Sequence, residues 1–195
     1  MKLLSFFCLF LAVTSCTFGQ TVSKDEQIAG AVQAGPADLR ADATVKGYDA
    51  DGNLVVLRKG SNILICLADD PAKKGFNSAC YHKDLEPFMA RSRELRAEGK
   101  TNGEIFQIKE EEVQSGQLKM PTKPTTLHIL YGSDGKYNTA SGVVENVDYR
   151  YVVYIPYATE ETSGLPLKPV VNGGPWLMDP GTHRAHIMIS TPPQN

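Results

Sequence analysis

The sequence lacks several features that would assign it to a large functional class. Its formal net charge is only −2 over 195 residues, so it offers no extended basic face to a nucleic-acid backbone or to anionic lipids. After residue 13, no apolar run approaches the length of a membrane span. The sequence also contains no Gly-x-Ser-x-Gly elbow and no Cys-x-x-Cys pair. These absences argue against a nucleic-acid-binding protein, a multi-span membrane protein, a serine hydrolase and a thiol oxidoreductase.

The amino terminus carries the most specific signal in the chain. Met1 and Lys2 precede an apolar run at residues 3–13, and small and polar residues follow it. This run is too short to span a bilayer and is typical of a secretory signal peptide, which we place at residues 1–20. The sequence Val-Thr-Ser-Cys that ends at Cys16 also fits a lipobox, in which cleavage before Cys16 leaves the cysteine lipidated.

The signal peptide predicts an exported protein that is periplasmic, tethered to the outer membrane or extracellular. Ordinary cleavage near residues 19–20 is the alternative to lipidation at Cys16. In either case, the only expected membrane contact is an amino-terminal lipid.

Four cysteines are present, and only Cys66 and Cys80 lie beyond the signal region. An even pair in an oxidising compartment is most simply a disulfide. It would close a loop of about fifteen residues, which the chain-entropy estimate values at roughly 3 kcal/mol. A redox or nucleophilic thiol is the alternative, with His82 close to Cys80 in the sequence. We predict the disulfide.

The rest of the chain has the length of one domain, and no linker divides it. Residues 21–35 are polar and rich in Ala, Gly and Gln, and we interpret them as a flexible tether. Residues 36–195 then form a single globular domain.

Runs of β-branched and aromatic residues predict several strands. Asp51-Gly52 separates residues 44–48 from residues 54–58, which is typical of a hairpin because Gly adopts the positive φ that tight turns need. Further strands are predicted at residues 63–67, 126–131, 149–155 and 184–190, and loops at residues 69–79 and 132–148.

The clearest helix begins after Asp84, a favourable N-cap, and Gly99 can end it. Its core face consists of residues at helical spacing, namely Leu85, Phe88, Met89, Ser92 and Leu95. Residues 104–120 are ambiguous between helix and strand. Together these elements predict an α+β fold, a compact single domain with a mostly antiparallel sheet and one main amphipathic helix.

Several short clusters resemble a family of exported bacterial proteins with no characterised activity. They are Gly60-Ser61-Asn62, Asp69-Asp70-Pro71, the two cysteines, Gly-Gly-Pro-Trp-Leu-Met at residues 173–178 and Ala-His-Ile-Met at residues 185–188. The chain departs from the family pattern at Leu64 and at residues 182–184, so the resemblance does not extend to His183. It implies export and a shared fold, and it implies no reaction.

His183 and His186 have the His-x-x-His spacing that places two imidazoles on one face of a helix, where they can bind a metal. Here the segment is predicted as a loop entering a strand, where a three-residue separation sends side chains to opposite faces. His128 and Asp179 are further candidate ligands, but the sequence does not show whether the fold brings them close to the two histidines. In the default interpretation, these histidines make hydrogen bonds within the core or with solvent and bind no metal.

Aromatic side chains offer a second candidate surface. Tyr149 and Tyr151 lie on one predicted strand, and Trp176 follows paired glycines. Tyrosine rings stack on sugars or peptides, although such a stripe is also typical of a strand half buried in a core.

No catalytic signature is assembled in the sequence, so we predict a binding domain without a resident cofactor. The expected partner is a small ligand or an envelope component, bound through Trp176, His186, Tyr149 and Tyr151, and nucleic acid is not expected. The alternative function is a metal-dependent or acid–base hydrolase that uses His186 with His183, His128 or Asp179.

Overall fold

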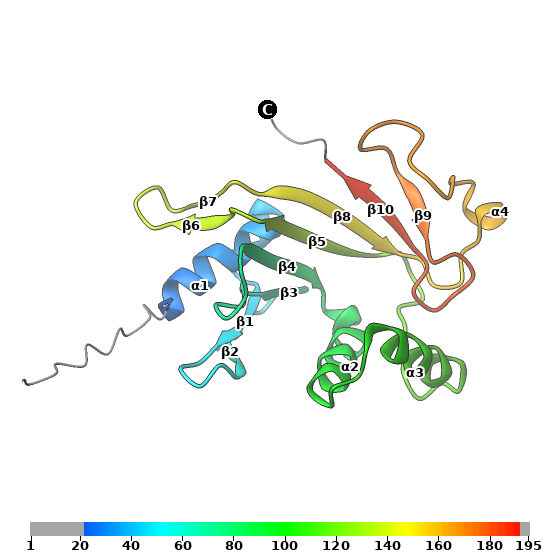
Figure 1. Ribbon diagram of the computed structural model, residues 1–195, viewed down its shortest axis with the longest axis horizontal. Helices are drawn as coiled ribbons and strands as arrows, with labels where there is room; N and C mark the ends of the chain where they lie inside the picture. The colour runs from blue at the N-terminus through cyan, green and yellow to red at the C-terminus, as the bar shows by residue number, and fades with distance from the viewer. Residues whose placement is uncertain (1–21, 192–195) are drawn as a thin grey trace, which may run out of the picture.

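One twisted sheet of eight strands organises the protein (Figure 1). The computed structural model describes residues 22–191, so the predicted signal peptide and Cys16 lie outside the described residues. The sheet has the order β2-β1-β3-β4-β5-β8-β10-β9, and its strands are β1 Thr44–Tyr48, β2 Leu54–Arg58, β3 Leu64–Leu67, β4 Phe76–His82, β5 Thr125–Gly132, β8 Asp148–Tyr154, β9 Trp176–Met178 and β10 His186–Ser190. Every neighbouring pair is antiparallel except β1 and β3. The predicted α+β class with a mostly antiparallel sheet is therefore confirmed.

The segments predicted as loops contain further strands. Residues 69–79 include the first half of β4. This part of the strand was not predicted, because Asn77 and Ser78 are polar. Residues 132–148 contain a small separate hairpin of β6 Lys136–Asn138 and β7 Val143–Glu145. Gln33 holds this hairpin, because its amide accepts from the Val144 N–H at 2.9 Å and donates to the Gly142 carbonyl at 3.1 Å.

Residues 22–191 contain four α-helices, three more than the one main helix predicted. The helices are α1 Lys24–Ala31, α2 Glu86–Ala97, α3 Asn102–Gln114 and the short α4 Glu160–Ser163, with single turns at Val32–Ala34, Ala37–Leu39 and Lys83–Leu85. The predicted helix corresponds to α2, which begins after the turn at Lys83–Leu85. The ambiguous stretch at residues 104–120 is largely α3. None of the helices within residues 22–191 has both the length and the apolar character that crossing a membrane requires.

Residues 24–34 do not form the expected flexible tether. Ser23 and Glu26 make a capping box that starts α1, each accepting from the other's backbone N–H. Ala31 and Ala34 are buried in the core, and Gln27 pairs with the backbone of Tyr48 on β1 through both its amide oxygen and its amide nitrogen. The globular domain therefore begins at this helix, before residue 36.

The two faces of the sheet carry separate cores. Side chains alternate between the faces along each strand, and direct cross-strand partners share a face. One face packs on α1 and contains Val45, Leu64, Cys66, Cys80 and Leu130. The opposite face packs on α2 and contains residues contributed by five elements, namely Tyr81, Leu85, Phe88, Leu127, Val152 and Tyr154. We call these the α1 face and the α2–α3 face.

The predicted Cys66–Cys80 disulfide is present on the α1 face. The two cysteines are direct cross-strand partners on β3 and β4, with Cα atoms 4.0 Å apart, and both are fully buried. A disulfide is typical of proteins that fold in an oxidising compartment, so its presence fits an exported protein.

Candidate functional site

The four predicted binding residues lie on both faces of the sheet and do not meet in one site. His186 on β10 is the direct partner of Met178 and Tyr154, and Trp176 is the partner of Met188, so Trp176 and His186 share the α2–α3 face. Tyr149 and Tyr151 alternate with Val152 and Tyr154 along β8 and lie on the α1 face. A single small ligand therefore cannot contact all four side chains.

Tyr149 and Tyr151 form a small aromatic group with His128. The two tyrosine rings are stacked at 5.4 Å between centroids, and His128 makes an edge contact with Tyr151 at 5.4 Å. The Tyr149 hydroxyl donates to the Gln33 carbonyl, which gives this ring a structural role against the end of α1. Because His128 belongs to this group, it lies on the opposite face of the sheet from His186.

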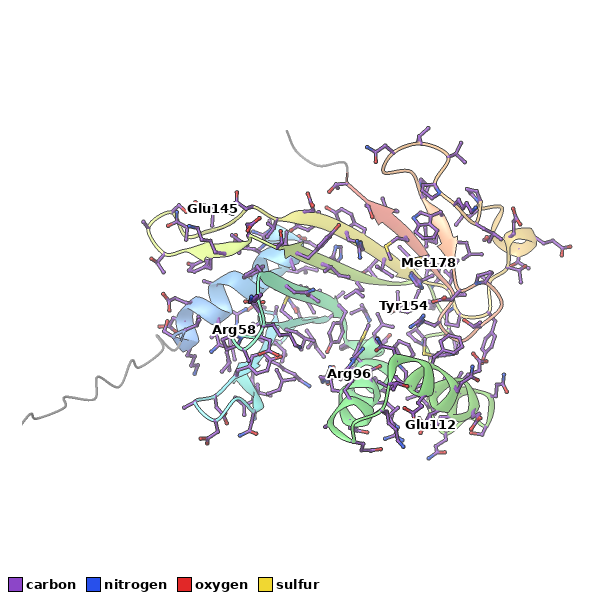
Figure 2. All side chains as sticks on the ribbon, viewed as in Figure 1. Arg58, Arg96, Glu112, Glu145, Tyr154 and Met178 are labelled. Atoms are coloured by element: carbon purple, nitrogen blue, oxygen red, sulfur yellow. A yellow bond between two sulfur atoms is a disulfide. The ribbon has the colours of Figure 1, made fainter. Side chains whose placement is uncertain are left out.

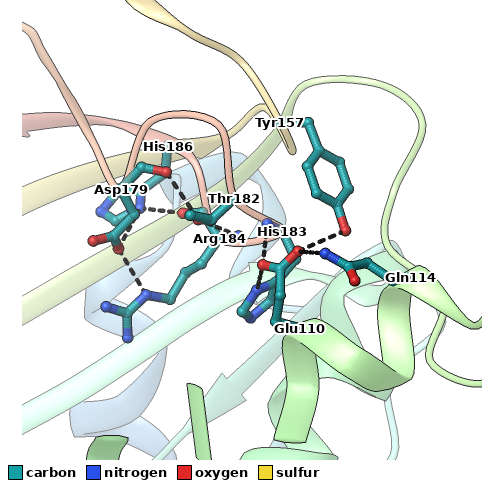
Figure 3. Close-up of polar contacts among 8 residues, drawn as sticks. All are labelled: Glu110, Gln114, Tyr157, Asp179, Thr182, His183, Arg184 and His186. Atoms are coloured by element: carbon teal, nitrogen blue, oxygen red, sulfur yellow. Dashed lines mark hydrogen bonds and ion pairs between the residues drawn. The ribbon is translucent and has the colours of Figure 1, made fainter. Parts of the chain in front are cut away.

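The segment before β10 approaches α3 and brings two clusters of polar side chains together (Figure 3). In the first cluster, His183 Nδ1 lies 2.5 Å from Glu110 Oε2, and the His183 backbone N–H donates to the same oxygen at 2.9 Å. Gln114 donates to Glu110 Oε1 at 2.8 Å, and the Tyr157 hydroxyl donates to it at 3.2 Å. Burial alone would raise the pKa of the Glu110 carboxyl. The hydrogen bonds from His183 and Gln114 outweigh this effect, so the pKa lies below its usual value and Glu110 is ionised.

The ionised Glu110 fixes the tautomer of His183. A carboxylate accepts only, so Nδ1 carries the proton and Nε2 is the unprotonated nitrogen. His183 is fully buried, and its Nε2 has no hydrogen-bond partner among residues 22–191. Burial lowers the pKa of His183 below 6.5, although Glu110 opposes this shift. His183 is therefore a neutral imidazole with one unengaged nitrogen.

The second cluster joins Asp179, Arg184 and His186. Arg184 Nε donates to Asp179 Oδ2 at 2.7 Å, and His186 Nδ1 donates to the Arg184 carbonyl at 2.7 Å. The Nδ1 of His186 lies 4.0 Å from the same Asp179 oxygen. Burial lowers the pKa of His186, so this imidazole is neutral near pH 7. The structure thus brings His186 close to Asp179, as the hydrolase alternative requires, but without His128.

The predicted pair of metal ligands does not form a cluster. Within residues 22–191, no three His, Cys, Asp or Glu side chains gather where they could share a metal ion. His183 and His186 each use Nδ1 in the contacts described above, to Glu110 and to the Arg184 carbonyl. The two imidazoles therefore do not form a pair of metal ligands.

A cavity of about 190 Å³ lies between the α2–α3 pair and the sheet. In Figure 2, Arg96 projects from the helical side and Tyr154 lies at the end of β8 above it. The cavity is lined by apolar residues and by an unusual number of basic side chains, namely Leu67, Phe88, Met89, Ser92, Arg93, Arg96, Asn102, Ile105, Phe106, Lys109, Tyr154, His183 and Arg184. Its size suits a ligand smaller than a typical drug molecule.

Lys109 on α3 is the most unusual residue of this cavity. Only 3% of its surface is exposed, and its Nζ donates to Ser92 Oγ at 2.5 Å and lies 3.0 Å above the centre of the Phe88 ring. No carboxylate of the described residues forms an ion pair with it. Burial, assisted by the positive charges of Arg184 and Arg96, lowers the pKa of Lys109 to about 7. The free amine is therefore favoured near pH 7 far more than in an exposed lysine.

The other basic residues differ in how their charge is balanced. Arg93 pairs with Glu86 at 2.8 Å and Arg184 with Asp179 at 2.7 Å. Arg96 is exposed, and no carboxylate within residues 22–191 forms an ion pair with it. The cavity therefore has an excess of positive charge over negative charge among its lining residues.

A larger hollow of about 470 Å³ lies beside α1. Its lining includes Glu26, Asp69 and Lys136. Burial raises the pKa of Asp69, but the Asp69 carboxyl already accepts the Asn77 N–H at 2.8 Å. This hollow has no counterpart to the buried amine and imidazole of the α2–α3 cavity, which is why we place the candidate site in the smaller space.

Sequence reasoning missed Lys109, Glu110 and Arg96. Residues 110–112 are three glutamates, so this stretch was expected to be exposed. The missed signal is the capping box of Thr101 and Glu104, which precedes Ile105 and identifies α3 as a helix. On that helix, Ile105 and Lys109 are four residues apart and share the buried face.

Comparison with known proteins found no matching family model, no matching curated protein and no matching solved structure. The resemblance to exported bacterial proteins therefore stays a prediction.

Proposed function

We propose that this protein is an exported domain that binds a small organic anion in the α2–α3 cavity. The amino-terminal signal sequence and the buried disulfide support export. One observation carries the binding proposal, namely that Lys109 is buried without a carboxylate partner among the described residues and lines a cavity that Arg96 and Arg184 also line.

The physical reason is that a buried amine without a counter-ion is costly. A carboxylate or phosphate group placed between Lys109 and Arg96 would supply the missing negative charge. It would also favour the ammonium form of Lys109, so binding and protonation would be coupled. Affinity should therefore increase as the pH falls through 7, because Lys109 gains its proton there.

The test is isothermal titration calorimetry of the mature chain with propionate and, separately, with inorganic phosphate. We expect saturable binding that weakens about tenfold in Arg96→Gln, which corresponds to the loss of one charge-assisted hydrogen bond. Lys100→Gln is the matched control, because it removes a positive charge just beyond the same helix without lining the cavity. Equal weakening in both variants, or no binding by the wild-type chain, would refute the proposal.

The hydrolase alternative keeps one specific observation in its favour. Glu110 orients the His183 imidazole and leaves its buried Nε2 without a hydrogen-bond partner among the described residues, at a residue that belongs to the cavity lining. Chromogenic esters and phosphomonoesters test this function directly. Activity lost in His183→Gln and retained in Tyr157→Phe would support it, whereas equal rates in His183→Gln and wild type would remove it.

A further inference from the structure

We propose that Lys109 is a nucleophile that condenses with the carbonyl group of a small 2-oxo acid bound in the α2–α3 cavity. This inference rests on the anion binding proposed above and names the class of ligand. Three observations support it: the state of the amine, the arrangement of the basic residues around it and the available proton acceptor.

The amine of Lys109 has the surroundings of a reactive lysine. Lysine attacks carbonyl carbons only as the free amine, which proteins favour by burying the side chain or by placing another cation near it. Both conditions hold here, because Lys109 is almost fully buried and the charges of Arg184 and Arg96 act on it. The Glu112 carboxylate, which acts in the opposite direction, is held by Arg91 at 2.8 Å.

The basic residues of the cavity favour a ligand whose acid group and carbonyl group are adjacent. Arg96 and Arg184 can hold a carboxylate through bidentate hydrogen bonds. In a 2-oxo acid, the carbonyl carbon is bonded directly to that carboxylate, so it would lie beside the arginines within the same small space. A cavity of about 190 Å³ accommodates a compact ligand of this kind and excludes larger ones.

The reaction is a condensation that releases water. The Lys109 nitrogen forms a bond to the carbonyl carbon, and the carbonyl oxygen takes up a proton to give a carbinolamine. The nitrogen releases one proton in forming the carbinolamine. The hydroxyl then takes up a second proton, the carbon–oxygen bond breaks, water leaves, and the nitrogen releases its last proton to give the neutral imine. His183 belongs to the lining of the same cavity, and its unprotonated Nε2 is buried without a partner among the described residues, so in this proposal it accepts a proton released from nitrogen. No oxidant or reductant is required.

Reductive trapping tests the proposal. The mature protein is incubated at pH 7 with pyruvate and sodium cyanoborohydride, which reduces an imine to a stable secondary amine, and the adduct is located by peptide mass mapping. We expect labelling of Lys109 at least about tenfold faster than at any exposed lysine, because burial and the nearby arginines favour its free amine near pH 7. Propionate, which has no carbonyl, should slow the labelling by competition.

Two variants make the result specific. Lys109→Met should lose the rapid adduct, whereas Lys74→Met, at an exposed lysine, should retain it. Thermal unfolding of Lys109→Met shows that a lost adduct does not reflect a lost fold.

The outcomes separate this inference from the proposed function. Propionate binding without a preferred adduct at Lys109 would overturn imine formation and leave anion binding intact. A rapid Lys109 adduct that propionate does not slow would support the reactive lysine and overturn the anion site. Slow labelling spread over exposed lysines, together with no propionate binding, would overturn both.

Discussion

The α1 face of the sheet carries a buried disulfide and small side chains beside the hollow of about 470 Å³, whereas the smaller cavity on the α2–α3 face is lined by buried titratable groups. On the α1 face, Ala31, Ala34 and Cys80 are fully buried, and a Cβ at Gly35 would lie only 2.7 Å from Leu64 Cδ2. On the α2–α3 face, Lys109 and His183 are buried and line the cavity of about 190 Å³. Under the proposed function, the disulfide and the ligand-binding side chains lie on opposite faces of the sheet, so we expect each face to tolerate changes with little effect on the other.

The largest expected effect is removal of the disulfide on the α1 face. The Cys66→Ala/Cys80→Ala double variant should lose about 3 kcal/mol of unfolding free energy, because the unfolded chain is no longer cross-linked. Urea denaturation measures this loss. Propionate affinity should stay unchanged under conditions where the variant is folded. A parallel loss of affinity would show that the two faces are coupled.

A smaller effect of opposite sign is expected for Lys109→Met on the α2–α3 face. Methionine fills a similar volume without an amine to desolvate, so the variant should gain about 2 kcal/mol at pH 7. Lys74→Met, at an exposed position, should change stability by no more than about 0.5 kcal/mol. A clear loss of stability in Lys109→Met would instead make the contacts of Lys109 with Ser92 and Phe88 structural.

The pH dependence of that gain has a definite sign. The folded-state pKa of Lys109 lies below that of the unfolded chain, so the unfolded state binds more protons between pH 7 and pH 10. Wild-type stability should therefore rise over this range relative to Lys109→Met, and the advantage of the variant should shrink. An advantage that is constant with pH would contradict the lowered pKa.

The smallest expected effects come from the two matching helix caps. Ser23→Ala on α1 and Thr101→Ala on α3 each remove one side of a capping box and should each cost about 1 kcal/mol. Only Thr101→Ala should also weaken propionate binding, because Asn102, Ile105 and Phe106 of α3 line the cavity. If Ser23→Ala and Thr101→Ala weakened propionate binding equally, the two faces would not differ in their contribution to binding.

Local signals in the sequence predicted much of the sheet. The turn at Asp51-Gly52 identified the β1–β2 hairpin, and β-branched residues identified β5 and β8. The disulfide followed from the even cysteine pair and the expected oxidising compartment. It could not be recognised as a cross-strand pair, because the consecutive polar residues Asn77 and Ser78 break the strand-like pattern of β4, and residues 69–79 were interpreted as a loop.

The candidate site could be predicted only in part. His183, His186 and Asp179 were identified because they are close in sequence, and the structure places them in adjacent clusters. Lys109 and Glu110 were missed because they come from α3, about 73 residues before His183 along the chain. A charged residue on a helix is expected to face solvent, and only the packing of α3 against α2 and the loop before β10 shows that Lys109 is buried.

Nuclear magnetic resonance titration of the Lys109 side chain tests anion binding at a buried amine most directly. The ¹³Cε resonance, assigned by comparison with Lys109→Met, reports the protonation of Nζ as the pH changes. We expect a pKa of about 7 in the free protein and an upward shift with saturating propionate. A pKa close to that of an exposed lysine, unchanged by propionate, would show that Lys109 is an ordinary ammonium and that the cavity is not an anion site.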